Sequence, residues 1–86
     1  MRLDKYLKVS RLIKRRTIAN EACDTGRVMI NDRVAKAGTE VKVGDIITIA
    51  FGNKEVKVEV TDVQETVKKE EAKELFRYLS GDTDIG

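Results

Sequence analysis

The chain has 86 residues, a formal net charge of +2, 37% charged residues and no histidine. This length fits one small domain with a modest core, and the lack of histidine excludes an imidazole general base, a histidine metal ligand and a histidine pH switch. The single cysteine, Cys23, excludes an internal disulfide and fits a reducing cytoplasm. The longest apolar run, "IITIAF" at residues 46–51, is too short to span a bilayer.

The first predicted element is a helix over residues 2–10, "RLDKYLKVS". Its buried side is expected to carry Leu3, Tyr6, Leu7 and Ser10. On the helix surface, Asp4 and Lys8 have the i,i+4 spacing of an ion pair. We expect residues 11–16, "RLIKRR", to end this helix and turn the chain, with Leu12 and Ile13 packed inward.

A second helix is predicted to begin at Arg16 or Thr17, with Thr17 as its N-cap. Its buried stripe is expected to contain Ile18, Ala19, Ala22 and Cys23. Gly26 is expected to stop the helix, because glycine adopts the left-handed conformation that is common just after a helix C-terminus. We interpret Cys23 as a buried structural thiol rather than a nucleophile.

After Gly26 the pattern changes to short strands and turns. The sequence predicts a strand at residues 27–30, a turn at 31–33, a loop through 34–45, a buried strand at 45–51 and a tight turn at 52–54. Val56, Val58 and Val60 alternate with Lys57 and Glu59. This alternation predicts the second strand of a hairpin, with one side facing solvent.

Residues 66–79, "TVKKEEAKELFRYL", predict a third helix. Its apolar side would hold Val67, Ala72, Leu75, Phe76 and Leu79. Residues 80–86 are expected to form a short flexible tail. The predicted fold class is α+β, with two N-terminal helices packed on a small antiparallel sheet and a C-terminal helix after it. We assign residues 1–63 to the main domain and residues 64–86 to the final helix and tail.

Charge is distributed unevenly along the chain. Residues 1–36 contain ten Lys or Arg and four Asp or Glu, whereas residues 37–86 contain seven and eleven, so their net charges are +6 and −4. Seven of the cations occur within the first sixteen residues. Cations crowded in this way repel one another, and nucleic-acid phosphates relieve the repulsion. The pattern favours a polyanion-binding surface over a merely solvated helix face.

An enzyme is disfavoured, because the carboxylates are scattered and the glycines form no phosphate-binding loop; no cofactor or metal is expected. Two helices joined by a turn suggest DNA binding. However, the second helix offers only Asn20 as a base reader, and Glu21 and Asp24 would approach phosphates unfavourably. The cations belong to the first helix and the turn, which suits recognition of structured RNA through backbone and shape.

Four motifs together resemble the S4 RNA-binding domain: "RLDKYL" at 2–7, "RRTIANEACDTGRVMIND" at 15–32, "KAGTEVKVGD" at 36–45 and "IITI" at 46–49. The resemblance implies the S4-type (alpha-L) fold for residues 1–63, with an RNA-binding face on the two helices and the turn between them. Where that family has a serine-arginine pair, this chain has "RRT". The family's arginine corresponds to Arg16, and Thr17 keeps the hydroxyl.

With its additional strand and final helix, the chain is similar to the stand-alone heat-shock-protein-15-like and RqcP-like factors of ribosome-associated quality control. This similarity implies binding to rRNA of the large ribosomal subunit and to peptidyl-tRNA, beside an RqcH-type tailing factor that adds C-terminal alanine tails to stalled nascent chains. We expect a cytoplasmic monomer with no membrane contact. The final helix carries Glu70, Glu71 and Glu74, which disfavours a second RNA contact there.

The predicted RNA-binding residues are Arg2, Lys5, Lys8, Arg11, Lys14, Arg15, Arg16, Thr17 and Lys36, with Arg33 as a weaker candidate. Arg16 is expected to be best placed, in a solvent-facing turn, because arginine can contact phosphate through two N–H groups. Three alternatives stay open: a helix-turn-helix DNA-binding regulator, a general rRNA- or tRNA-binding assembly factor, and a protein-interaction module that uses the final helix and the strand "KEVKVEV" at 54–60.

Overall fold

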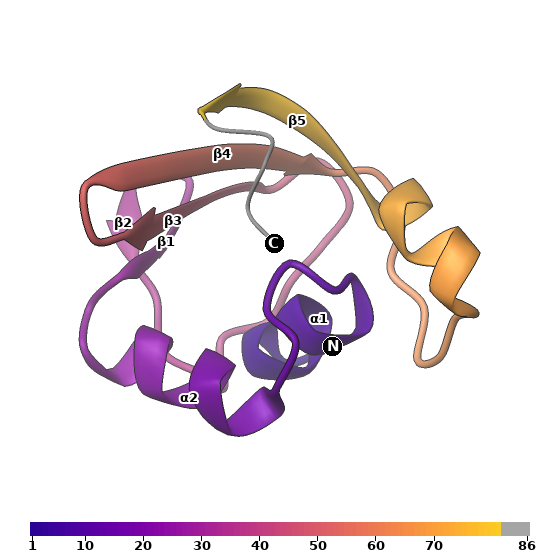
Figure 1. Ribbon diagram of the computed structural model, residues 1–86, viewed down its shortest axis with the longest axis horizontal. Coiled ribbons are helices and arrows are strands. Elements are labelled where there is room, and N and C mark those ends of the chain that lie inside the picture. Colours follow the sequence, from indigo (N-terminus) through magenta and orange to yellow (C-terminus); the bar gives the residue numbers. More distant parts are fainter. Residues whose placement is uncertain (82–86) are drawn as a thin grey trace.

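The structure, a computed structural model, describes residues 1–81, and Figure 1 shows an antiparallel sheet with two helices on one of its faces. The helices and strands are α1 (Leu3–Val9), α2 (Arg16–Asp24), β1 (Val28–Ile30), β2 (Arg33–Val34), β3 (Ile46–Phe51), β4 (Lys54–Val60), the 3₁₀ helix η1 (Lys69–Leu75) and β5 (Phe76–Gly81). The strand order in the sheet is β2-β1-β3-β4-β5. The predicted α+β class with a small antiparallel sheet is confirmed. No helix within the described part of the chain is long and apolar enough to cross a membrane.

The core lies between the sheet and the helices. Its largest fully buried apolar side chains are Leu3, Tyr6, Leu7, Val28, Ile47, Ile49, Val56, Val58, Val60 and Leu75. The predicted alternation along β4 is confirmed, because its three valines are fully buried and Lys57 and Glu59 between them are only half-buried. Leu12 and Ile13 also pack inward as predicted. The turn between α1 and α2 is therefore attached to the core.

The two ends of α2 are built differently. The helix begins at Arg16, as predicted, but Arg15 rather than Thr17 occupies the N-cap position, and no side chain of residues 1–81 caps the helix. At the other end, Gly26 has a φ of 78°. Its N–H donates to the carbonyl of Cys23 at 3.1 Å, and the N–H of Arg27 donates to the carbonyl of Ala22 at 2.9 Å. This Schellman arrangement confirms Gly26 as the stop signal.

Both predicted turns are present, and the first of them forms a hairpin with the short strand β2, which was predicted as loop. Asn31 and Asp32 connect β1 to β2 with φ values of 52° and 67°, which is the left-handed pair that a two-residue hairpin turn requires. Gly52, with a φ of 57°, begins the turn from β3 to β4. These two strands pair from Ile46 opposite Glu59 to Phe51 opposite Lys54.

The chain after β4 differs from the prediction. The predicted third helix is present only as the 3₁₀ helix η1, so the prediction is wrong at residues 66–68 and again from Phe76 onward, where residues 76–81 form β5. β5 pairs with β4, with Phe76 opposite Val60 and Arg77 opposite Glu59. The backbone groups along the edge of β4 thereby gain hydrogen-bond partners. Residues 80–81, predicted as tail, end β5, and residues 82–86 lie outside the described part. The division of the chain at residue 63 stays a prediction.

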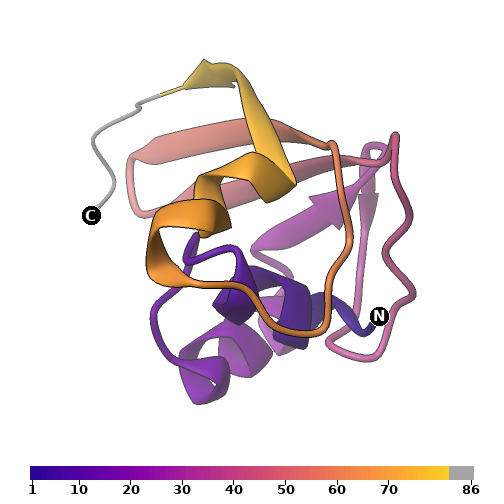
Figure 2. The same cartoon turned by 90° about the vertical axis from the view of Figure 1, so that its right-hand side faces the viewer.

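Tyr6 connects η1 to α1. Its hydroxyl donates a hydrogen bond to the backbone carbonyl of Leu75 at 2.7 Å, and the same carbonyl accepts the N–H of Thr61 at 2.9 Å. Burial, with a smaller contribution from the charge of Asp62, raises the pKa of Tyr6, so the hydroxyl keeps its proton. Figure 2 shows the result, with η1 lying between β5 and the helical layer.

Cys23 is fully buried on α2, which confirms the predicted burial of its thiol. Burial, with the nearby charges of Asp4 and Asp24, raises the pKa of Cys23 to about 11. We expect the folded protein at pH 8 to react with iodoacetamide at least about 100-fold more slowly than an exposed thiol, because only the thiolate attacks. Mass spectrometry of timed samples, with and without urea, measures both rates. Equal rates in the two conditions would contradict the burial of Cys23.

Candidate RNA-binding surface

The helix α1, the turn after it and the segment between β4 and η1 enclose a hollow of about 450 Å³. We refer to it as the basic hollow. Its lining residues are Lys5, Lys8, Val9, Arg11, Lys14, Arg16, Glu65, Thr66 and Val67. Five of the nine predicted RNA-binding residues therefore meet at one site, although they come from α1, the turn and the first position of α2.

The turn places its cations at the surface because the residues between them are buried. Ser10 is 2% exposed, and its hydroxyl donates to the carbonyl of Leu7. Arg11 then adopts a left-handed φ of 61°, which redirects the chain. Leu12 and Ile13 pack into the core. As a consequence, the side chains on either side of this apolar pair point out of the fold.

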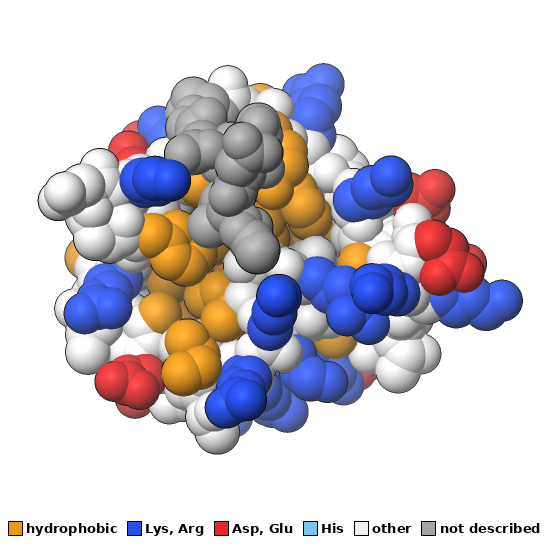
Figure 3. Space-filling model, viewed as in Figure 1, with side chains coloured by type: hydrophobic (Ala, Val, Ile, Leu, Met, Phe, Trp, Pro, Cys, Tyr) orange, Lys and Arg blue, Asp and Glu red, His pale blue; other side chains and the backbone are white. Residues whose placement is uncertain are grey.

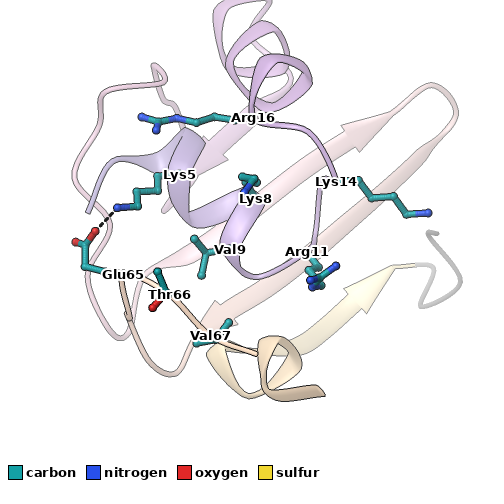
Figure 4. A pocket seen from close by; sticks show the side chains of 9 residues that line it. All are labelled: Lys5, Lys8, Val9, Arg11, Lys14, Arg16, Glu65, Thr66 and Val67. Atoms are coloured by element: carbon teal, nitrogen blue, oxygen red, sulfur yellow. Dashed lines mark hydrogen bonds and ion pairs between the residues drawn. The ribbon is translucent and has the colours of Figure 1, made fainter. Parts of the chain in front are cut away.

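The cations of the basic hollow extend in different directions. Figure 4 shows Lys5 and Arg16 extending to one side of α1, Arg11 lying near the end of α1, and Lys14 pointing to the opposite side. The space-filling view in Figure 3 shows the Lys and Arg side chains of this face gathered mainly to one side of an apolar patch. A polyanion following this face would meet several cations in succession, which is the arrangement that phosphate binding requires.

Some of the predicted cations already have carboxylate partners. Lys5 pairs with Glu65 across the basic hollow, as Figure 4 shows, and the guanidinium groups of Arg2 and Arg16 both pair with Asp4. Within residues 1–81 no ion pair engages the exposed cations Lys8, Arg11, Lys14 and Arg15. The predicted cations without an ion-pair partner therefore lie mainly at the end of α1 and in the turn.

Asp4 is the centre of a buried hydrogen-bond network, with 2% of its surface exposed. Its Oδ1 accepts the Nε–H of Arg2 at 3.2 Å and the backbone N–H of Lys5 at 2.8 Å. Its Oδ2 accepts the Nε–H of Arg16 and the side-chain amide of Asn20, each at 3.3 Å. The network joins the first turn of α1 to the first two turns of α2.

This network corrects three predictions. Asp4 does not pair with Lys8, because its carboxylate is turned toward α2. Asn20 is not free to read a base, because its amide is bound to Asp4. Arg16, predicted in a solvent-facing turn, has a side chain that is 48% exposed, but it is the first residue of α2 and its guanidinium group pairs with Asp4. A cation at a helix N-terminus is unfavourable, and the carboxylate beside Arg16 offsets that effect.

Hydrogen bonding keeps Asp4 ionised. Burial alone would raise its pKa, but the bonds from Asn20, Arg16, Arg2 and the Lys5 backbone together hold the pKa of Asp4 below its usual value. The stabilisation from these bonds is therefore present above the ordinary aspartate pKa and is lost as the pH falls through the lowered one. At neutral pH both arginines face a charged partner.

The other predicted residues lie outside the basic hollow. Arg2 precedes α1 and is 56% exposed. Arg15 is exposed at the N-cap of α2, Thr17 is exposed in its first turn, and Lys36 is exposed in the loop after β2. Their roles in binding, like those of the five residues in the basic hollow, stay predictions.

Ile18 does not join the buried stripe of α2. It is 50% exposed, whereas Ala19 and Cys23 are fully buried and Ala22 is half-buried. Ile18 lies one residue before Ala19 on the helix, so it is rotated by about 100° away from the buried side. With Phe51 it lines an apolar groove of about 530 Å³ that Arg11, Leu12, Ile13, Lys14 and Arg15 complete.

Sequence reasoning missed two lysines that the fold brings close to Arg11. Lys69 and Lys73 of η1 line a third hollow, of about 420 Å³, together with Arg11, Ser10, Glu70, Ala72 and Phe76. The prediction treated this segment as acidic because of its glutamates. No local pattern indicates this placement, because it joins residues that are far apart in sequence, as does the bond from Tyr6 to the Leu75 carbonyl.

Comparisons with known proteins agree on the family. The S4 domain profile matches residues 1–47. The chain is 64% identical over 76 residues to the RQC P-site tRNA stabilizing factor of Halalkalibacterium halodurans, covering 88% of this chain and 86% of that protein. It is 56% identical over 79 residues to the same factor of Bacillus subtilis, covering 92% of each. The trimeric structure of Vibrio cholerae Heat Shock Protein 15 superposes with a TM-score of 0.85 at 30% identity, over 93% of this chain and 82% of that one.

Proposed function

The chain belongs to the S4 domain family and to the family of the RQC P-site tRNA stabilizing factors, and on this basis we propose that it binds tRNA and rRNA on the large ribosomal subunit during ribosome-associated quality control. The observation that carries the proposal is the basic hollow, in which five cations from α1, the turn after it and the first position of α2 line one cavity. Phosphate groups are the ligands that such a cluster of lysine and arginine fits.

The chemistry of the surface favours recognition of backbone and shape. Lys8, Arg11 and Lys14 can reach phosphates without giving up an ion pair within residues 1–81. Asn20 is bound to Asp4 and is not available to a base edge. Glu21 and Asp24 are exposed on α2 and would repel a DNA backbone in the major groove. Structured RNA is therefore favoured over duplex DNA.

The proposed action is holding rather than chemical conversion. A protein of this size, acting as a monomer in the cytoplasm, would grip rRNA and peptidyl-tRNA together and stabilise the tRNA between rounds of C-terminal alanine addition. The RqcH-type factor would perform the tailing itself. The name of these relatives, which refers to stabilising P-site tRNA, supports the holding role.

A pull-down of the tagged protein from cell lysate tests the proposal. We expect large ribosomal subunits that carry peptidyl-tRNA, identified by their rRNA and by ribonuclease-sensitive nascent chains. A tagged, unrelated basic protein of similar size serves as the control for non-specific charge. Recovery of small subunits, of assembly intermediates without tRNA, or of DNA would contradict the proposal and favour the assembly-factor or DNA-binding alternative.

A further inference from the structure

We propose that Asp4 is a positioning residue for RNA binding: it holds the Nε edges of Arg2 and Arg16 inside the fold so that their outer N–H groups face phosphate. This inference rests on the proposed function. It concerns a buried carboxylate that an RNA-binding surface would otherwise be expected to avoid, since its negative charge repels phosphate.

The contacts give each arginine an inner and an outer edge. Arg2 and Arg16 donate Nε–H to the two different oxygens of Asp4, at 3.2 Å and 3.3 Å. Asp4 has a side-chain exposure of 3%, whereas Arg2 and Arg16 are 56% and 48% exposed. A guanidinium group has five N–H donors, so each arginine keeps four that do not bind Asp4. Among residues 1–81 these outer donors have no other hydrogen-bond partner.

Further contacts limit the freedom of the carboxylate and of Arg2. The backbone N–H of Lys5 and the amide of Asn20 fix the orientation of Asp4 itself. A Cβ atom on Gly38 would lie 3.9 Å from Cζ of Arg2, so this guanidinium lies against the backbone at Gly38. Arginine side chains that are already ordered lose less conformational entropy when they bind.

A purely structural role for Asp4 is the competing explanation, because the same bonds join α1 to α2. The two roles differ in the sign of their effect on RNA affinity. Asp4→Asn removes one negative charge, so electrostatics alone would strengthen binding to a polyanion. Positioning instead requires weaker binding, because the amide has an NH2 group in place of one of the two oxygens and therefore releases one of the two arginines.

We expect Asp4→Asn to bind large ribosomal subunits about 10-fold more weakly despite its higher net charge. Affinity is measured by co-sedimentation at a temperature where the melting curve shows the variant to be folded. Folded Asp4→Asn that binds as tightly as the wild type, or more tightly, overturns the inference.

Arg16→Lys tests the same idea without a buried substitution, which matters if Asp4→Asn does not fold. Lysine keeps the charge but cannot offer one edge to Asp4 and another to phosphate. We expect a loss of about 10-fold, against no more than about 3-fold for Arg11→Lys, whose arginine has no ion pair within residues 1–81. Equal losses in the two variants overturn the inference and leave the proposed function intact. Failure of the wild-type protein to bind ribosomal subunits overturns the proposed function and this inference together.

Discussion

Replacing Lys8 and Arg11 together by alanine is expected to weaken binding to the large ribosomal subunit about 100-fold and to leave the fold intact. Both side chains line the basic hollow and are exposed. Neither has an ion-pair partner within residues 1–81, so their removal leaves no buried charge unpaired. A hydrogen bond to a charged group contributes about 1.5–3 kcal/mol, and about 1.4 kcal/mol corresponds to a factor of ten. Arg11 has a left-handed φ, and because alanine has a Cβ atom as arginine does, Arg11→Ala adds no new backbone strain there.

The salt dependence of binding separates direct phosphate contacts from a general loss of charge. If the wild type neutralises about six phosphates, log affinity falls with log salt concentration at a slope of roughly −4 to −5. The double variant is expected to reduce the size of that slope by about 2, one for each lost contact. Arg27→Ala with Lys42→Ala is the matched control, since it also removes one arginine and one lysine, neither of which lines the basic hollow.

The outcome of these titrations tests the electrostatic basis of the proposal directly. A wild-type slope near zero would contradict phosphate binding by this surface. Equal slopes and affinities in the two double variants would show that only net charge matters. Thermal melting of both variants provides the stability control, and a large fall in the melting temperature of the Lys8 and Arg11 variant alone would contradict its assignment as a surface pair.

The part of the candidate binding surface that could be predicted from the sequence is the part that depends on local sequence. Seven cations in the first sixteen residues necessarily lie on or beside the first helix, and the buried pair Leu12 and Ile13 fixes which way the turn faces. The role of Asp4 could not be predicted in this way. The i,i+4 rule indicated Lys8 as its partner, whereas the fold brings in Arg16 and Asn20 from another helix.

The same contrast holds for the fold. The conformations of Gly26 and of the alternating valines of β4 could be predicted, because a positive φ and a two-residue period are local properties of the sequence. In residues 66–79, by contrast, the spacing of apolar residues and the many Lys, Glu and Ala residues favour a helix. The chain forms β5 after Leu75 because β4 offers an unpaired edge, and tertiary pairing of this kind overrides intrinsic propensity.

Leu75 and Leu79 provide a direct test of this difference, because a continuous helix would place both on one apolar side. In the structure, Leu75 of η1 is 1% exposed and packs in the core, whereas Leu79 of β5 is 43% exposed. We expect Leu75→Ala to lower the free energy of unfolding by about 2–4 kcal/mol, through lost burial and the cavity left behind. Leu79→Ala, which makes the same chemical change, is expected to cost no more than about 0.5–1 kcal/mol.

Urea denaturation of the three proteins measures these differences, with far-ultraviolet circular dichroism as the signal. For a domain of this size each kcal/mol also lowers the melting temperature by about 4–8 °C, so the two variants are readily separated. Comparable losses at Leu75 and Leu79 would contradict η1 and β5 and favour a helix through residue 79. A small loss at both positions would mean that η1 does not belong to the core.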